Sequence, residues 1–256
     1  MRICGIVAGG VVASLVSGCG DSTTSPGSSD AQLNLMIGIE SAAPGGAVDA
    51  GLAAAETIEA GGHTLVIDRA QLVLRKLVLK RVEDSIECPD DDSGGSDDDD
   101  CELLRLGPLL VDLPLDGNIE RVFGVPVEPG SYRRMGFQLH KPSDDVGDAA
   151  FLAANPTFEG ISIRIEGTFD GTPFVWEDDV TATQHSFFSP PLEVVASETE
   201  LTELTLRVDV AKWFRDQSGT GLIDPATATG GALESRVRQN IRASFRFASR
   251  RGPRNP

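Results

Sequence analysis

Two of the four cysteines flank an acidic stretch, and their thiols could form a disulfide or contribute to a metal site. Cys88 and Cys101 stand on either side of residues 89–100, which consist almost entirely of Asp, Ser and Gly. An even pair of cysteines in an exported protein usually forms a disulfide, and closing a loop of this length stabilises a fold by about 3 kcal/mol. A metal–thiolate site would need further Cys or His ligands, and none is adjacent in the sequence. We therefore predict a disulfide between Cys88 and Cys101.

Oxygen-bearing side chains at two places could bind calcium, which prefers six to eight oxygen ligands. The acidic residues 89–100 lack the ligand spacing of an EF-hand loop. A second segment, 216–224, alternates oxygen-bearing side chains with other residues. Its candidate ligands are Asp216, Ser218, Thr220 and Asp224. A glycine-rich turn explains the same pattern, so the sequence leaves two interpretations open: a calcium site with calcium as the cofactor, or a plain turn without a cofactor.

Residues for transition-metal binding or catalysis are not gathered in any motif. The histidines His63, His140 and His185 fall on separate segments without a ligand spacing between them, and we expect them at the surface. No Gly-x-Ser-x-Gly nucleophile motif occurs, and no phosphate-binding glycine loop precedes a helix. One tyrosine and two tryptophans offer few rings for stacking on sugars. The sequence therefore predicts a protein that is not an enzyme.

The first residues predict export and attachment of lipid. Arg2 supplies a positive charge, and residues 3–16 form an apolar stretch of about fourteen residues, which is shorter than the roughly twenty that a membrane-spanning helix needs. The segment that follows, Val16-Ser17-Gly18-Cys19, resembles the lipobox of bacterial lipoproteins, whose cysteine sulfur receives a diacylglyceryl group. We expect cleavage before Cys19 and attachment to a membrane through lipid on this cysteine.

These features divide the chain into four parts. Residues 1–18 are the expected signal peptide, and residues 19–31 are the lipidated cysteine and a flexible tether without large apolar side chains. Residues 32–251 are long enough for one β-sandwich domain, and residues 252–256 are an expected disordered tail. The Ala-rich and Gly-rich residues 41–62 lack apolar periodicity, so we expect a connection there.

The charge of the chain limits its partners. The formal net charge is −17, so nucleic acid would be repelled and is excluded as a partner. Acidic residues cluster at 90–100, whereas arginines crowd the C-terminal end, and solvated surfaces explain both clusters. The remaining partners are a membrane, through lipid on Cys19, and an envelope protein or glycan. Gly20 after the cysteine favours the outer membrane in a cell with two membranes.

Hydrophobic periodicity predicts the fold. Ile161, Ile163 and Ile165 alternate with polar residues, which is the signature of a strand with one solvated face. Similar alternation occurs around residues 33–39, 63–68, 70–82, 103–113, 119–127, 134–140, 173–177, 191–197 and 203–210. Glycine, proline, asparagine and aspartate separate these segments. We expect an all-β fold, an antiparallel β-sandwich of the immunoglobulin or transthyretin kind.

Two segments look helical. Residues 211–216 could form one turn that presses Trp213 and Phe214 on the sandwich. Near the C-terminus, Val237, Ile241 and Phe245 recur every four residues, whereas residues 237–247 also alternate with period two. We favour a short C-terminal helix over a strand.

The order of these elements resembles a group of bacterial lipoproteins without an assigned activity. The segments that carry the resemblance are 69–82, 107–115, 125–132, 160–169 and 208–214. The element Pro129-Gly130-Ser131-Tyr132 is also similar to a turn and strand of envelope β-sandwich families, including copper-associated ones with ligand His and Trp. The resemblance implies the fold and the compartment and transfers no activity. We expect a membrane-anchored lipoprotein of the cell envelope with a non-catalytic binding or structural module, and calcium binding is the alternative.

Overall fold

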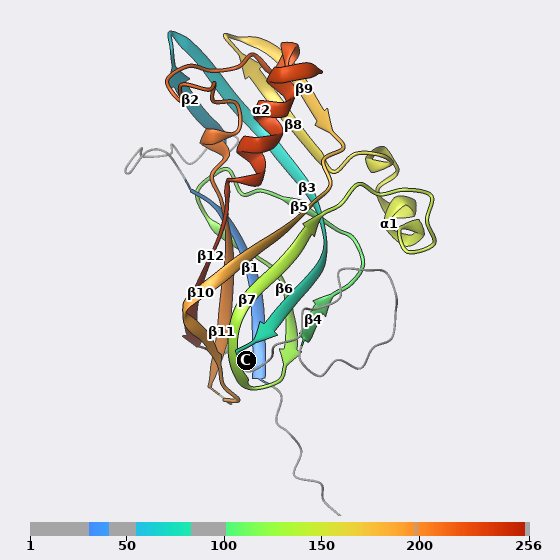
Figure 1. Ribbon diagram of the computed structural model, residues 1–256, viewed down its shortest axis with the longest axis vertical. Helices are drawn as coiled ribbons and strands as arrows, with labels where there is room; N and C mark the ends of the chain where they lie inside the picture. The colour runs from blue at the N-terminus through green and yellow to red at the C-terminus, as the bar shows by residue number, and fades with distance from the viewer. Residues whose placement is uncertain (1–30, 41–54, 83–100, 198, 254–256) are drawn as a thin grey trace, which may run out of the picture.

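The computed structural model describes the backbone of residues 31–40, 55–82, 101–197 and 199–253, and their side chains except those of residues 101–103, 252 and 253. Two β-sheets lie against each other, which confirms the predicted sandwich-like all-β fold (Figure 1). The first sheet has the order β12-β11-β1-β6. Its strands are β1 (Ala31–Ile39), β6 (Ile119–Val127), β11 (Glu200–Val208) and β12 (Phe245–Pro253). Strand β1 thus begins one residue before, and strand β12 ends two residues after, the limits predicted for the domain.

The second sheet is organised around one long strand. It has the order β10-β7-β3-β8-β9, and β2, β4 and β5 also pair with β3. Its strands are β2 (Glu56–Ala60), β3 (His63–Arg81), β4 (Cys101–Arg105), β5 (Leu109–Asp112), β7 (Gly130–Leu139), β8 (Ile163–Phe169), β9 (Thr172–Asp178) and β10 (Ala182–Val194).

Strand β3 shows why the sequence predicted two strands where there is one. Leu65 and Ile67 face the core, the register then shifts between Ile67 and Arg69, and the core-facing positions become Ala70 and Leu72. A bulge of this kind adds a residue and reverses the alternation without ending the strand. The interruption at Arg69 therefore looked like a boundary in the sequence.

One strand pair departs from the predicted antiparallel arrangement. Strands β1 and β11 are parallel, from Leu33 opposite Thr202 to Ile39 opposite Val208, whereas the other pairs of named strands are antiparallel. A short hairpin forces antiparallel pairing, but these two strands are far apart in the chain, so no turn sets their relative direction. Alternation of apolar residues carries no information on direction.

A second correction concerns residues 41–62, which we expected to be a connection. Strand β2 occupies the end of this segment and forms a hairpin with β3. Gly61 and Gly62 lie between the strands with φ of +61° and +83°, as two-residue hairpin turns require. Ile58 is the one large apolar residue of β2, and so the strand gave little periodic signal. Residues 41–54 lie outside the described residues.

The C-terminal segment contains both structures that its pattern allowed. Helix α2 (Gly231–Arg242) buries Val237 and Ile241, and strand β12 then begins at Phe245. The other helix, α1 (Ala149–Ala154), and the 3-10 helices η1 (Pro156–Phe158) and η3 (Pro225–Thr227) were not predicted. No helix within the described ranges is long and apolar enough to cross a membrane.

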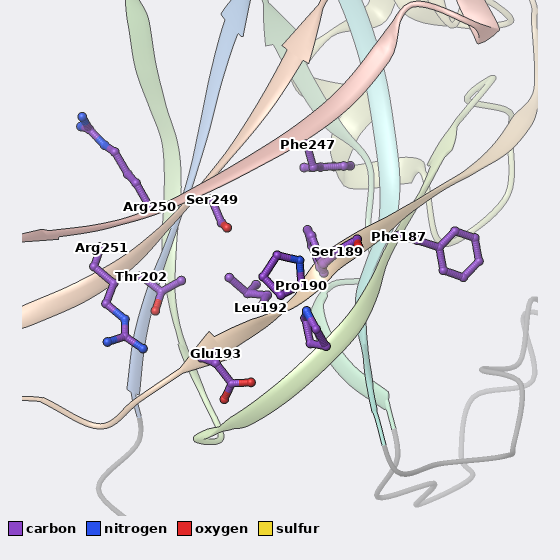
Figure 2. A pocket seen from close by; sticks show the side chains of 12 residues that line it. Phe187, Ser189, Pro190, Leu192, Glu193, Thr202, Phe247, Ser249, Arg250 and Arg251 are labelled. Carbon is purple, nitrogen blue, oxygen red and sulfur yellow. The ribbon is translucent and has the colours of Figure 1, made fainter.

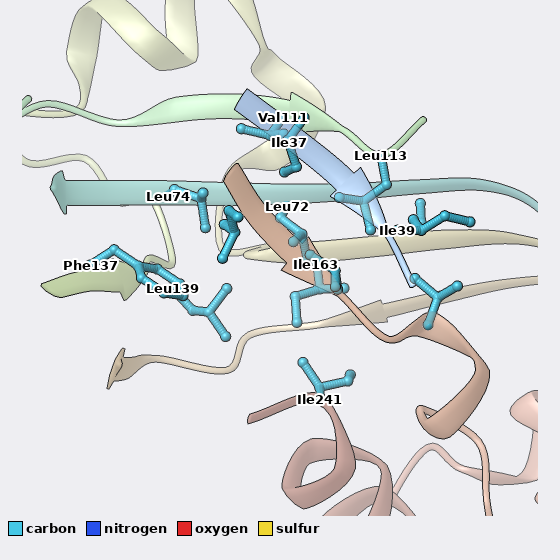
Figure 3. Packing of buried hydrophobic residues seen from close by; sticks show 14 of the residues in the cluster. Ile37, Ile39, Leu72, Leu74, Val111, Leu113, Phe137, Leu139, Ile163 and Ile241 are labelled. Atoms are coloured by element: carbon cyan, nitrogen blue, oxygen red, sulfur yellow. The ribbon is translucent and has the colours of Figure 1, made fainter. Parts of the chain in front are cut away.

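The core lies between the sheets and extends under α2 (Figure 3). The predicted turn after β11 is the 3-10 helix η2 (Val210–Lys212), and it places Trp213 and Phe214 in the core with no exposed surface. The indole N–H of Trp213 donates to the Ser244 hydroxyl at 2.9 Å, and Trp176 contacts Phe214 edge to face. These rings join both sheets and α2 in one core.

Helix α2 is also held on the second sheet by ion pairs. The Arg238 guanidinium donates to Asp178 at 2.8 Å and to Asp179 at 2.7 Å, and it pairs with Glu234 at 2.6 Å. The Asp178 side chain is 1 % exposed, and burial raises the pKa of its carboxyl although Arg238 opposes the shift. The negative charge of this buried carboxylate is thus compensated mainly by the Arg238 guanidinium.

We expect Arg238→Ala to lower the free energy of unfolding by about 2–3 kcal/mol in urea denaturation. Breaking a fully buried pair costs about 3–5 kcal/mol, and the loss is smaller here because Arg238 is partly exposed. The matched variant Arg236→Ala removes a half-buried guanidinium of the same helix, which donates to the exposed Gln239 and not to a buried carboxylate, and should change stability by less than about 0.5 kcal/mol. Equal losses in both variants would contradict the role of Arg238.

Gly167 gives a test of the bulge in β3. A Cβ at this position would lie 1.9 Å from the carbonyl oxygen of Val66, so Gly167→Ala must displace the backbone of β3 or β8. We expect a loss of about 2–3 kcal/mol in the free energy of unfolding, as for other overpacked sites. Gly107→Ala, where a Cβ meets nothing within 4 Å, is the control and should be nearly neutral. A neutral Gly167→Ala would mean that the two backbones do not approach so closely.

Candidate binding groove

A groove opens between the two sheets where edge strand β10 faces edge strand β12 (Figure 2). Its volume is about 550 Å³, within the range of about 300–1,000 Å³ that is typical of small-ligand sites. Side chains from three strands line it. They are residues 187–193 of β10, Thr202 of β11, and Phe247, Ser249, Arg250 and Arg251 of β12.

The groove exists because β10 leaves its neighbour. The pairing of β10 with β7 shifts register between Phe187 and Leu192. Pro190 and Pro191 lie in this interval, and proline has no backbone N–H to donate to a neighbouring strand. The strand therefore continues without regular pairing and opens a space toward β12.

The register of β11 and β12 decides which side chains face this space. Residues opposite each other on paired strands share one face of the sheet. Ser249 is opposite Leu204 and Arg251 is opposite Thr202, and both β11 residues are buried between the sheets. Ser249 and Arg251 therefore point into the groove.

Arg250 has a different environment from its neighbour Arg251. The two side chains leave β12 in opposite directions, as successive residues of a strand must (Figure 2). Arg250 forms an ion pair with Glu203, which lies opposite it on β11. The guanidinium that faces the inner side of the sheet is that of Arg251.

The floor of the groove is apolar and continuous with the core. Leu192 is 5 % exposed, and Phe188 and Phe247 pack partly buried against the core. The Phe247 ring contacts Phe137 edge to face, with 5.8 Å between the ring centres. Phe187 instead points away from the groove and is 70 % exposed (Figure 2).

This arrangement can bind an apolar group and an anion together. Phe188, Leu192 and Phe247 supply apolar surface, and Arg251 supplies a positive charge beside the hydroxyl groups of Thr202 and Ser249. The lining also holds the carboxylate of Glu193, which accepts from the Ser131 hydroxyl at 2.6 Å.

The predicted lipid and disulfide sites fall outside the described side chains. Cys19 and Cys88 lie outside the described residues, as does the acidic segment 89–100. Cys101 begins β4, and its side chain is not described. Lipid attachment at Cys19 and the disulfide between Cys88 and Cys101 remain predictions.

The predicted calcium ligands form a tight turn. The Ser218 hydroxyl donates to Asp216 at 2.7 Å and lies 2.7 Å from the Thr220 hydroxyl, so the structure brings these three side chains together. The Asp224 carboxylate instead accepts from the N–H of Ala226 at 2.9 Å and caps η3. Calcium binding here remains a prediction.

A second cleft, of about 690 Å³, lies beside this turn and α2. Its lining includes the acidic residues Glu40 and Asp216 and the basic residues Lys212 and Arg236. Lys212 is paired with Asp209 inside the cleft. The mixed charges give this cleft no preference for an anion or a cation.

The histidines do not come together, and one of them corrects the prediction of surface positions. His140 is buried: its Nε2 lies 2.8 Å from the Asp148 carboxylate, which also accepts from the N–H of Ser143. His63 is exposed and bonded to Asp170 at 2.7 Å. His140 directly follows strand β7, and residues 143–148 pack over it. No pattern in the sequence indicated that this segment would bury the histidine. In the ranges that the structure describes, no three His, Cys, Asp or Glu residues form a group that could hold a metal.

The groove was not predicted from the sequence, although two features of the sequence point to it. The run Phe187-Phe188-Ser189-Pro190-Pro191 combines apolar residues with prolines that interrupt strand pairing. The apolar residues at alternate positions end at Phe247, and the next two alternate positions are Ser249 and Arg251. The same face of the strand is therefore apolar first and then polar. Each feature indicates a site only when the fold places β10 of one sheet opposite β12 of the other.

Comparison with known proteins adds little to this description. No protein-family model matches the chain, and no curated protein matches it significantly. Among solved structures, the fold is distantly similar to MbnP from Methylosinus trichosporium, with 13 % sequence identity, a TM-score of 0.33, and coverage of 80 % of this chain and 81 % of that chain.

The turn at Asp216 predicts a pH dependence. The hydrogen bond from the Ser218 hydroxyl, followed by those from backbone N–H groups, holds the pKa of the Asp216 carboxyl below its ordinary value. A lowered pKa in the folded state means that Asp216 stabilises the fold above its unfolded pKa and that this contribution disappears as the pH falls through the lowered pKa. Thermal melting should therefore show Asp216→Asn less stable than the parent at pH 6, with the difference vanishing near pH 2.

The control for this measurement is Asp144→Asn, which removes the same charge from an exposed position. Its melting temperature should stay close to that of the parent at both pH values. A difference for Asp216→Asn that persists undiminished in acid would show that the carboxylate charge does not stabilise the turn. Repeating the melts at pH 7 with calcium and then with a chelator tests the calcium prediction, since a bound ion must raise the melting temperature.

Proposed function

We propose that this protein is a cell-envelope lipoprotein, attached to a membrane through lipid on Cys19, and that its β-sandwich is a non-catalytic binding module. The groove between β10 and β12 is the binding site. The observation that carries the binding role is the combination of an apolar floor with the inward-facing guanidinium of Arg251.

The N-terminal residues support the anchored state. The lipobox-like Val16-Ser17-Gly18-Cys19 follows an apolar stretch that suits an export signal. Two or more acyl chains hold a protein on a membrane durably, at roughly 0.8 kcal/mol per buried methylene group. The resemblance to bacterial lipoproteins and to envelope β-sandwich families agrees with this placement, and Gly20 favours the outer membrane where a cell has two.

The chemistry of the groove supports binding over catalysis. An activated nucleophile needs a base within hydrogen-bond reach, and the carboxylate of the lining, Glu193, accepts from the Ser131 hydroxyl at 2.6 Å instead. The His140–Asp148 pair could serve as a base elsewhere, but both side chains are buried and Asp148 is 1 % exposed. The partners that fit are therefore ligands that are held and not converted.

The anchoring is tested by metabolic labelling with radioactive palmitate in a bacterial host that lipidates exported proteins. The parent chain should take up label and sediment with membranes, because the Cys19 sulfur carries the lipid. Cys19→Ala should lose the label and remain uncleaved at residue 18.

The matched control is Cys4→Ala, which removes another N-terminal cysteine that lies within the expected signal peptide. It should be labelled like the parent chain. Equal label in the parent chain and in Cys19→Ala would overturn the proposed anchoring.

A further inference from the structure

We infer that the groove between β10 and β12 binds one fatty acid, with the carboxylate held by Arg251 and the acyl chain laid on Leu192, Phe188 and Phe247. This assignment of the ligand rests on the proposed binding role of the groove.

The head group is determined by charge. Arg251 faces the inner side of its sheet, where the residue opposite it, Thr202, is 3 % exposed. Arg251 is exposed and therefore open to a ligand, and a guanidinium binds a carboxylate through charge-assisted hydrogen bonds, which are stronger than neutral ones. The chain as a whole carries a net charge of −17, so this cationic point selects an anion where most of the molecule repels it.

The apolar floor of the groove indicates that the rest of the ligand is an apolar chain. Leu192 and Phe247 belong to, or pack against, the buried core, and the space above them opens directly from the position of Arg251 along β12. Apolar surface buried by a ligand contributes about 25 cal/mol per Å². A compact anion such as phosphate would leave this surface uncovered, whereas an acyl chain covers it.

Both edges of the groove disfavour an extended peptide as the occupant. A peptide that adds a strand needs free backbone N–H groups along an edge, and Pro190 and Pro191 remove two of them from β10. On β12, Arg246, Arg250 and Arg251 are charged side chains of the kind that protect edge strands from pairing. The groove thus receives side-chain contacts in preference to a backbone ladder.

The position of the groove matches a ligand that comes from the membrane. Leu33, near the start of β1, lies opposite Thr202, which in turn lies opposite Arg251. Two inter-strand spacings, about 10 Å, therefore separate Arg251 from the strand that follows the expected tether. The start of β1 and the end of β12 lie at the same end of the sandwich (Figure 1). A groove at the anchored end is within reach of free fatty acids in the lipid layer.

Calorimetric titration with decanoate tests the assignment. The full chain carrying Cys19→Ala is used, so that no acyl chain attached to the protein competes and the result does not depend on lipidation. Decanoate should bind with one site per chain, and 1-decanol, which has the same chain without the charge, should bind at least about tenfold more weakly.

Two further variants in the same background locate the site. Arg251→Gln should weaken decanoate binding about tenfold or more and leave decanol binding unchanged, because only the carboxylate contact is lost. Ser249→Trp, which fills the groove from an exposed position, should abolish binding of both probes. Arg246→Gln removes an arginine from the opposite face of β12 and should bind decanoate like the parent chain.

Three results would overturn the inference: no binding of decanoate, equal affinity for decanoate and decanol, or unchanged decanoate affinity in Arg251→Gln. The last result, together with aggregation of Arg251→Gln, would assign Arg251 to protection of the sheet edge. Tighter binding of an acidic peptide than of decanoate would also overturn it. Failure of the anchoring is seen separately, in the palmitate label, and does not affect these titrations.

Discussion

Strand β3 must keep its apolar side chains on the core over nineteen residues, and the rest of the fold depends on how it does so. Two shifts of register, at Ile67–Arg69 and at Arg75–Val78, return the apolar residues to the inner face each time the strand twists away from the core. Strands β8 and β7 follow one another along the same side of β3, since Val73 bonds to Ser162 through its N–H and to His140 through its carbonyl oxygen. Strands β9 and β10 therefore also follow one another, and β10 becomes the free edge that borders the groove.

The fold was predictable where a strand has one apolar and one polar face, and less so elsewhere. Residues 161–169 and 203–210 show this alternation plainly, and the structure has strands β8 and β11 there. Strand β2 was missed because Ile58 is its one large apolar residue, and the direction of β1 against β11 is not encoded in either strand. The groove could not be predicted because its two walls, at residues 188–192 and 247–251, are far apart in the chain.

Two arginines form ion pairs that hold the last two elements of this acidic chain, α2 and β12, on the sandwich. Arg238 joins α2 to the carboxylates at the end of β9, and Arg250 joins β12 to Glu203 of β11. Arg238 meets three carboxylates, of Asp178, Asp179 and Glu234, which would otherwise repel one another, whereas Arg250 meets the single carboxylate of Glu203. Arg251, beside Arg250 on the same strand, has the opposite orientation, and the alternation of a β-strand thus directs one of two neighbouring arginines to an ion pair and the other to the groove.

Strand β1 occupies the middle of its sheet, with β11 parallel on one side and β6 antiparallel on the other. A force applied at Ala31 along the strand would load the hydrogen bonds to both neighbours in shear. Peeling an edge strand breaks such bonds one at a time, whereas shear requires many to break together. The element that directly follows the expected tether is therefore a central strand, held on both sides, and tension along that tether would load both neighbours together instead of unravelling an edge.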